Sequence, residues 1–444
     1  MKKNKTSLPR AAGGAGSLFR SPDGTSFLVP FAMVTSLFLL WGFAHGLLDV
    51  LDKHFQNTLH VSKAESGMVQ FSLYIGYLVM AGPAGTFMKR YGYQKGIILG
   101  LLLFAAGAFL FYPAAKLGAY IPFLLALFII ACGLSTIETA ANPYTTTLGP
   151  PDGAARRINI AQSFNGMGWI LGPLIGGLLI FGANELVTPY LWIGGLVLVV
   201  CGLFKIIRLP VIQEDNQEGI AEDAPLSQLF KHRGFVLAVI AQFLYVAAQT
   251  GVNSFFINYV TETTAGVQAT VAGMMQHLGR FGGIFMPRNP EQAASLILAL
   301  GGMGSFWIGR LSAAYIMKFV SPARLLALYA TVNTILMVLV ILRLGWPSVI
   351  ALFSTYFFMS LMFPTIFALG LRNLGPLTKR AASILVMAVA GGAFCPPLMG
   401  VIADHSGMSI AFIVPLVCFA FIAWFAATES KKPMPINSLA ITHH

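Results

Sequence analysis

Two acidic residues stand inside stretches of the chain that are otherwise apolar. Asp49 closes the segment Trp41–Asp49, near the end of the first apolar run, and Glu138 lies in the middle of the fourth run. Charge inside a membrane is costly and is by default a sign of function. A carboxylic acid in a water-poor surrounding can hold a proton and release it when water arrives, so both residues are candidates for coupling transport to a cation. The alternatives are an interfacial position for Asp49 and a structural pair with a neighbouring helix for Glu138.

Polar side chains near these acids recur at helical spacing. A separation of three or four residues places two side chains on one face of a helix. The pairs are His45 with Asp49, Glu138 with Asn142, Gln162 with Asn165, and Gln249 with Asn253. Amides both donate and accept hydrogen bonds, which suits a ligand dense in hydroxyl groups. Hydrogen bonding between helices is the alternative. Pro143, which lacks an N–H, is expected to loosen the helix beside Glu138.

Other chemistry is weakly represented in the sequence. Aromatic residues that flank polar or proline positions are candidates for contact with a ligand: Trp41, Tyr144, Phe306 and Phe363. A phosphate-binding Gly-x-x-x-x-Gly-Lys-[Ser/Thr] loop, a zinc-ligand cluster and a serine-nucleophile elbow are all absent from the sequence, so we expect neither an ATP-driven pump nor an enzyme. The cysteines fall in apolar runs without paired spacing and are expected to be small buried residues. No cofactor or metal site is predicted.

Composition places the protein in a membrane. The chain has 444 residues, of which 56% are hydrophobic and only 10% charged, whereas a soluble domain carries about 25% charged residues. The net charge of +12 could suggest nucleic-acid binding. The basic residues lie in short loops between apolar runs, however, where they orient helices relative to the membrane. Lipid is therefore the expected partner, and nucleic acid is not.

Twelve apolar runs are long enough for membrane spans, which need about 20 residues each. They lie near residues 27–51, 68–88, 95–115, 121–147, 158–182, 188–207, 234–260, 294–317, 323–343, 347–371, 381–403 and 409–428. The expected fold is an all-α polytopic membrane protein. We divide it into an N-terminal tail (1–26), a six-helix bundle (27–207), a linker (208–233), a second six-helix bundle (234–428) and a C-terminal tail (429–444). Basic residues in alternate loops place both tails and the linker in the cytoplasm.

The two predicted bundles repeat one another. Met88–Lys95 is echoed by Met317–Arg324, and Gly168–Gly176 is echoed by Gly392–Gly400. Echoes in the same order and at similar offsets indicate a duplicated chain. Duplicated six-helix halves build one large class of transporters, whose substrate binds near the midplane between them.

Several motifs together resemble a known family. They are Glu138–Pro143, Asn159–Asn165, Ala247–Thr250, Gly309–Arg310, Phe363–Phe367 and Arg372–Gly375. From about Phe31 to Ala427 the chain resembles the fucose:proton symporter family of the major facilitator superfamily, which includes bacterial fucose and glucose/galactose carriers. The resemblance implies the major facilitator fold of two pseudo-symmetric halves, a bacterial inner (plasma) membrane location and a functional monomer.

The resemblance also implies roles for individual residues. Asp49 and Glu138 match the protonation and sugar-coupling acids of the fucose symporter, and Arg310 would belong to the superfamily's gating motif. The residues matching Gln162 and Asn165 lie in the central cavity of that carrier. Together with the spacing and flanking positions given above, this leads us to expect the sugar to bind at His45, Asn142, Gln162, Asn165, Gln249, Asn253, Phe306 and Phe363.

The chain departs from the fucose symporter at two of these positions. His45 and Gly46 stand where that carrier has two asparagines, and Asn253 stands where it has a tryptophan. We therefore expect cation-coupled symport of a monosaccharide by alternating access, with a proton as the coupling ion and glucose or galactose favoured over fucose. Sodium coupling and an uncoupled sugar facilitator are the alternatives. The segment 262–290 is longer than the family's usual external loop, and the sequence assigns it no role.

Overall fold

In the computed structural model the chain is almost entirely helical. The structure describes residues 19, 26–149, 154–182, 186–207, 227–317, 319–372, 374 and 377–431. Within these ranges twelve helices are long and apolar enough to cross a membrane, which confirms the number predicted from the sequence. Most of the predicted tails and linker lies outside the described residues, and the bounds of the predicted domains stay predictions.

The helices follow one another as two sets of six crossings. The first set is α1 (Leu28–Leu59), α3 (Met68–Tyr91), α4 (Tyr93–Leu117), α5 (Tyr120–Thr147), α6 (Ala154–Gly176) with a π-helical end (Gly177–Gly182), and α7 (Val187–Ile206); the short α2 (Lys63–Ser66) precedes α3. The second set begins with α9 (Arg233–Thr263), after the short α8 (Ser227–Lys231).

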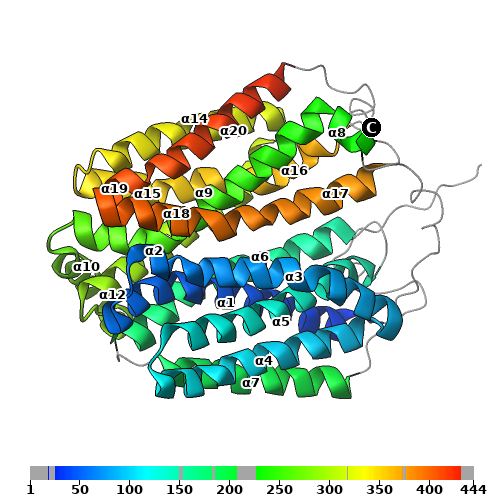
Figure 1. Cartoon of the computed structure of the whole chain (residues 1–444), viewed down its shortest axis with the longest axis horizontal. Helices are drawn as coiled ribbons and strands as arrows, with labels where there is room; N and C mark the ends of the chain where they lie inside the picture. Colours follow the sequence, from blue (N-terminus) through cyan, green and yellow to red (C-terminus); the bar gives the residue numbers. More distant parts are fainter. Residues whose placement is uncertain are drawn as a thin grey trace, which may run out of the picture.

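Most later crossings are built from two or three consecutive segments. The second crossing of the second set joins α12 (Pro290–Leu296), a π-helical stretch (Ile297–Met303) and α13 (Gly304–Ile316); α14 (Pro322–Ile341) is the third. The fourth joins α15 (Trp346–Met359) to α16 (Met362–Gly370), the fifth joins α17 (Thr378–Met387), a 3-10 turn (Ala388–Ala390) and α18 (Gly391–Ser406), and the sixth joins α19 (Met408–Ala411) to α20 (Ile413–Ser430). Figure 1 shows the two sets as two layers, with α1, α3, α4, α5 and α7 in one and α14, α15, α18 and α20 in the other.

The first helix is longer than predicted. It continues to Leu59, so Asp49 lies well inside it and not near its end as the hydropathy of the run suggested. Val50, Leu51 and Phe55 are all fully buried and extend the apolar packing of the helix past the acid. A position for Asp49 at the end of its helix is therefore wrong, and its depth in the membrane stays a prediction.

The structure adds detail at two other places. The segment 262–290 is partly helical and holds α10 (Val267–Gln276) and α11 (Gly279–Ile284). Helix α5 runs without interruption past Pro143 to Thr147, so the proline does not break the helix beside Glu138.

Glycines allow the helices of the first set to approach closely. At the crossing of α1 and α6, a Cβ added to Gly172 would lie 2.6 Å from the Gly46 backbone, and one added to Gly46 would lie 2.9 Å from Pro173 Cδ. Small residues at helix crossings are the usual means of close backbone packing in membranes. This crossing places the polar side chains of α1 beside those of α6.

The two sets meet mainly at one face of the molecule. We call the "linker face" the side where α1 and α9 begin and α7 and α20 end, and the "far face" the side that carries α2, α10 and α12 (Figure 1). The extensive contacts between the sets include α2 with α18, α3 with α18, and α1 with α9. The π-helical end of α6 also packs on α12. These contacts gather toward the far face.

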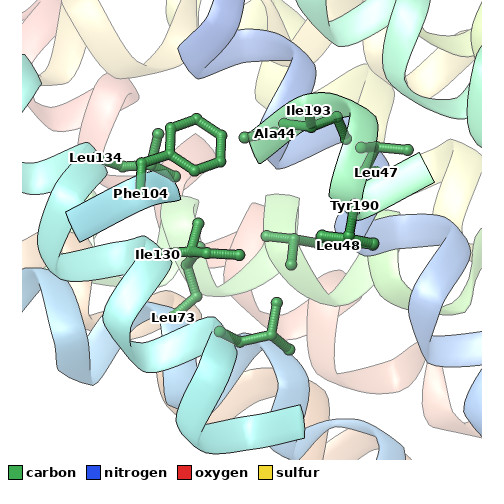
Figure 2. Close-up of a pocket in the computed structure, with 10 residues that line it drawn as sticks. Ala44, Leu47, Leu48, Leu73, Phe104, Ile130, Leu134, Tyr190 and Ile193 are labelled. Atoms are coloured by element: carbon green, nitrogen blue, oxygen red, sulfur yellow. The ribbon is translucent and has the colours of Figure 1, made fainter. Parts of the chain in front are cut away.

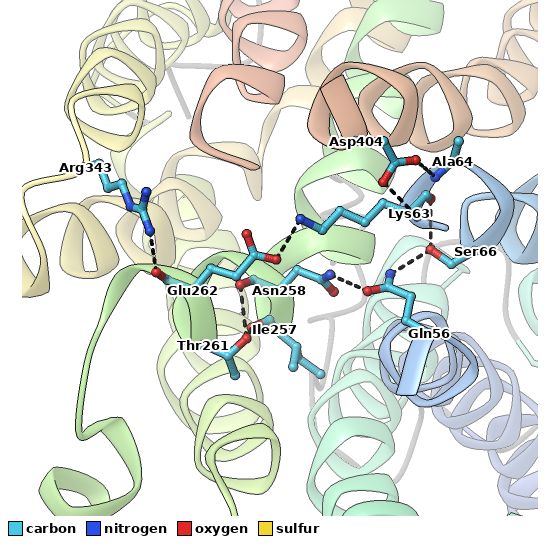
Figure 3. A network of polar contacts seen from close by, with 10 residues as sticks. All are labelled: Gln56, Lys63, Ala64, Ser66, Ile257, Asn258, Thr261, Glu262, Arg343 and Asp404. Atoms are coloured by element: carbon cyan, nitrogen blue, oxygen red, sulfur yellow. Dashed lines mark hydrogen bonds and ion pairs between the residues drawn. The ribbon is translucent and has the colours of Figure 1, made fainter. Parts of the chain in front are cut away.

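A polar network ties the sets together at the far face (Figure 3). Asn258 Nδ2 on α9 donates to Gln56 Oε1 on α1 at 2.5 Å. Lys63 Nζ pairs with Glu262 at 2.8 Å. The Asp404 carboxylate accepts from the backbone N–H groups of Lys63 and Ala64 at 3.1 and 2.9 Å. The far face is thus closed by direct contacts between the two halves.

Candidate functional site

Two helices of the first half carry polar faces that point into the protein. On α1 the residues His45, Asp49 and Asp52 follow the spacing of one helix face, and all three are buried. On α3 the residues Gln70, Tyr74 and Tyr77 have the same spacing, which places them on one face. Both carboxylates of α1 therefore lie within the protein and not against lipid.

Asp49 is enclosed by groups from both halves. Its side chain is 1% exposed, and Oδ1 accepts a hydrogen bond from Gln70 Nε2 at 3.4 Å. Its Oδ2 is buried without a hydrogen-bond partner. Asp49 also lies within electrostatic range of Tyr356 on α15 of the second half. One carboxylate oxygen is therefore free to carry a proton at the boundary between the halves.

Glu138 borders a small cavity between α1, α5 and α6. The cavity is lined by Leu37, Phe38, Trp41, Ile137, Glu138, Ala141 and Gln162. Apart from Glu138, its polar lining groups are the indole of Trp41 and the amide of Gln162. A carboxylate, an amide and an aromatic ring around one space are the groups that a sugar uses, because its hydroxyls need donors and acceptors and its C–H faces pack on rings. Glu138 and Gln162, predicted separately, are thus brought together.

His45 lies in an aromatic surrounding one turn from Trp41. Its ring centroid is 4.9 Å from that of Trp41, 5.7 Å from Tyr77 and 5.4 Å from Trp169. His45 Nδ1 is 3.0 Å from the Trp41 carbonyl oxygen, and the Trp41 indole N–H donates to the Tyr77 hydroxyl. The histidine shares a helix face with Asp49, as predicted, but its nearest ring neighbours belong to the Glu138 side of the site.

Tyr74 links the two halves of the protein. Its hydroxyl is 3.0 Å from Thr250 Oγ1 on α9 of the second half. It lies within electrostatic range of both Asp49 and Glu138. A single phenol thus joins the halves by a hydrogen bond and lies in the electrostatic surroundings of both acids that the sequence singled out.

The other four of the five predicted amides have different surroundings from Gln162 and from one another. Asn165 is buried and donates from Nδ2 to the Phe38 carbonyl oxygen at 3.3 Å, so it holds α6 against α1. Asn142 and Asn253 each have a buried Oδ1 without a hydrogen-bond partner. Gln249 is partly buried on α9. Asn142 and Asn253 therefore keep an acceptor for a ligand, whereas the Asn165 amide already has a structural partner.

Arg310 and the two predicted phenylalanines form a separate group in the second half. The Arg310 guanidinium lies 4.9 Å from the centre of the Phe306 ring, and its Nε donates to the Ser360 carbonyl oxygen at 3.5 Å. Phe363 packs edge-on against Tyr245, with 6.2 Å between ring centroids. Tyr245 in turn lies within electrostatic range of Arg310. The partners of Arg310 named here belong to its own half, and its predicted gating role stays a prediction.

A second cavity lies inside the first bundle and away from these polar groups. Figure 2 shows its lining, which comprises Ala44, Leu47, Leu48, Leu73, Phe104, Leu127, Ile130, Leu134, Tyr190 and Ile193. A sugar in this space would lose hydrogen bonds to water and regain almost none, which costs free energy for every buried hydroxyl. The apolar cavity is therefore not a candidate sugar site.

Groups of three or more His, Cys, Asp or Glu side chains able to hold a metal ion are absent from the described ranges. The four cysteines are free and buried, as predicted.

The fold and site define a class of protein. The model of the Major Facilitator Superfamily matches residues 25–390, and the chain belongs to this superfamily of membrane transporters. It is thus an integral membrane protein with the twelve-helix fold predicted from the sequence.

Two relatives of the chain are named as sugar carriers. The chain is 36% identical over 435 residues to the L-fucose-proton symporter of Escherichia coli (strain K12), covering 91% of this chain and 94% of the relative. It is 34% identical over 410 residues to a glucose/galactose transporter of Brucella abortus, covering 90% and 93%. Among solved structures it resembles the fucose symporter FucP in the outward conformation, with 35% identity, a TM-score of 0.64 and coverage of 91% and 100%.

Several site residues escaped the sequence analysis. The sequence analysis did not name Asp52 on α1, or Gln70, Tyr74 and Tyr77 on α3, although on both helices these residues are spaced three or four apart. Asp52 was placed beyond the end of the first helix, and tyrosine was treated as an ordinary aromatic residue. One pattern in the sequence could have indicated them. Positions 45, 49 and 52 have the same spacing as positions 70, 74 and 77, which is the spacing of one helix face in each case.

Proposed function

We propose that this protein is a proton-coupled monosaccharide symporter that works by alternating access between its two halves. The observation that supports this most is a pair of acids inside the first bundle, the fully buried Asp49 and the partly buried Glu138, which both lie within electrostatic range of Tyr74. A carrier that equilibrates sugar without coupling needs no acid in this position, and burying one is costly. The relatives named as a fucose-proton symporter and a glucose/galactose transporter support the same class of cargo.

The sugar is proposed to bind beside Glu138. Trp41 and Gln162 border the same cavity as this acid, and the partnerless Oδ1 atoms of Asn142 and Asn253 offer acceptors. His45 and Gln249 are further proposed contacts, as are Phe306 and Phe363 from the second half. Asn165 keeps its place among the proposed contacts only through the oxygen of its amide, since the nitrogen donates to Phe38. Arg310 is proposed to control opening. Glucose or galactose is proposed over fucose, because His45 and Asn253 replace residues of the fucose carrier.

The proposed cycle uses the far-face contacts as one of two gates. In the structure these contacts join the halves, and we propose that they close the route from the far face to the cavity beside Glu138. Sugar and proton would enter when the far face opens and leave when the linker face opens. With both termini proposed to be cytoplasmic, the protein acts as a monomer for uptake across the inner membrane.

Uptake of labelled glucose into proteoliposomes tests the proposal. We expect accumulation under an imposed proton gradient, no accumulation under a sodium gradient alone, and competition by galactose stronger than by fucose. Accumulation driven by sodium alone would establish the sodium symporter, and simple equilibration under both gradients would establish the facilitator.

A matched pair of variants tests the role of Glu138. Glu138→Gln should abolish gradient-driven accumulation while exchange of labelled for unlabelled sugar persists, because the amide keeps hydrogen bonds but cannot release a proton. Glu65→Gln is the control, since Glu65 is exposed and its carboxylate accepts from the Ser62 backbone N–H within the first half, and a glutamine can keep that hydrogen bond. Full accumulation by Glu138→Gln would refute the coupling role.

A further inference from the structure

Asp52 is buried at the contact between the halves and is not used by the proposed cycle. It lies one turn beyond Asp49 on α1, and its side chain is 0% exposed. Neither of its carboxylate oxygens has a hydrogen-bond partner. A buried carboxylate with no partner is costly, and a residue that keeps this arrangement needs an explanation.

The groups that face Asp52 come from three helices and carry no positive charge. Asp49 on α1 and Tyr120 on α5 interact with it electrostatically, and the Ser254 hydroxyl approaches it from α9. Ser254 is itself fully buried, and its oxygen has no partner in the structure. From α3, Gln70 donates to the neighbouring Asp49.

Nearby cations on the same end of the molecule are engaged elsewhere. Lys63 pairs with Glu262 at 2.8 Å. Lys53, which follows Asp52 in the chain, interacts with Glu291 and Glu262. Asp52 therefore faces a second acid and two hydroxyls. Its charge is not balanced by a cation among the described residues.

With the far face closed, as in the structure, the contact between α1 and α9 helps to enclose this acid pair. Ser254 belongs to the second half, and one turn further Asn258 bonds to Gln56 across the same boundary. Closing the halves removes water from two neighbouring carboxylates. If both were ionised, the lost hydration and the repulsion between like charges would each oppose closure by several kcal/mol. A proton on the pair removes the repulsion and supplies a donor for the Ser254 oxygen or for the second carboxylate.

We propose that Asp52, together with Asp49, forms a second proton-binding site at the contact between α1 and α9, and that the far face closes once this pair has taken up a proton. The proton comes from water at the open far face and forms an O–H bond on one of the two carboxylates. The inference rests on the proposed proton coupling and deepens it. It makes the acid pair a sensor that permits closure, whereas Glu138 acts at the sugar.

The distance between spin labels across the far face tests this without any sugar. Leu117 at the end of α4 and Ile410 on α19 are exposed, at 69% and 47%, and belong to different halves. The four native cysteines are buried, so cysteines introduced at these two positions can be labelled selectively. In nanodiscs we expect the ratio of short to long distances to rise as the pH falls, by up to about tenfold per pH unit for one linked proton.

Three variants separate the possible outcomes. Asp52→Asn should give short distances at every pH, because the amide resembles the protonated acid, and Asp52→Glu should keep the pH dependence. Glu138→Gln should also keep it, which distinguishes failure of this inference from failure of the coupling role of Glu138. A wild-type pH dependence in Asp52→Asn overturns the proposal, as does closure driven by sodium at constant pH. If Asp52→Asn does not fold, an unmoved midpoint in Asp52→Glu overturns it instead.

Discussion

Replacing Tyr74 by phenylalanine should shift the equilibrium between the open and closed far face. The change removes only the hydroxyl that lies 3.0 Å from Thr250 Oγ1, and the ring keeps its packing. A neutral hydrogen bond contributes about 0.5–1.5 kcal/mol net. Since this bond joins α3 to α9, that free energy belongs to the closed state. The ratio of closed to open molecules should therefore fall by about two- to tenfold.

Tyr77→Phe is the matched control on the same helix. The Tyr77 hydroxyl accepts from the Trp41 indole, and both residues belong to the first half. The variant loses a hydrogen bond of the same kind, but the bond exists in the open and closed states alike. Spin labels at Leu117 and Ile410 should report a shift for Tyr74→Phe and none for Tyr77→Phe.

A double-mutant cycle decides whether the Thr250 contact carries the effect. Thr250→Val alone should produce a shift of similar size, and combining it with Tyr74→Phe should add little, because both changes remove one bond. The reasoning fails if Tyr74→Phe and Tyr77→Phe shift the ratio equally, or if the effects of Tyr74→Phe and Thr250→Val are additive.

Three further predictions concern packing, charge and access. Gly46→Ala should destabilise the protein by about 1–3 kcal/mol and lower its thermal midpoint in detergent, because the new methyl group would meet Pro173. Gly195→Ala is the control and should leave the midpoint unchanged, since nothing lies within 4 Å of the new atom. Lys63→Ala should favour the open far face by less than about 1 kcal/mol, since the ion pair with Glu262 is partly exposed. High salt screens this pair, so it should shift the wild type in the same direction and leave the variant unchanged. Maleimide should label the cysteines only as fast as the protein unfolds; rapid labelling of folded protein would contradict their burial.

The number and approximate positions of the membrane-spanning helices could be predicted from the sequence, because each depends only on a local run of apolar residues. Lipid demands about 20 apolar residues for each crossing, and this requirement is local. The first helix shows the limit of the argument. Hydropathy fell at Asp52, Lys53 and His54, and the span was ended at residue 51, yet the helix runs to Leu59. Burial by other helices, not contact with lipid, holds that last stretch.

Site residues could be predicted from the sequence only where they lie on one helix and share its spacing. The spacing of His45 and Asp49 on α1 is visible in the sequence, and so is that of Gln162 and Asn165 on α6. The contact of Tyr74 with Thr250 joins residues far apart in the chain, and no local pattern indicates it. Asn165 illustrates the converse, because its amide matched a sugar ligand in the sequence but donates to the Phe38 carbonyl oxygen in the structure.

Because α1 and α9 are long, we expect the thickness of the bilayer to affect the closure of the far face. They have 32 and 31 residues and thus extend about 45–48 Å at 1.5 Å per residue, against a hydrocarbon core about 30 Å thick. The surplus must be taken up by tilt or by protrusion at the headgroups. Because the bond between Gln56 and Asn258 lies near the far ends of both helices, a change in the tilt of one helix relative to the other changes its geometry. We therefore expect lipids with longer acyl chains to act on the gate mechanically, without binding to any pocket.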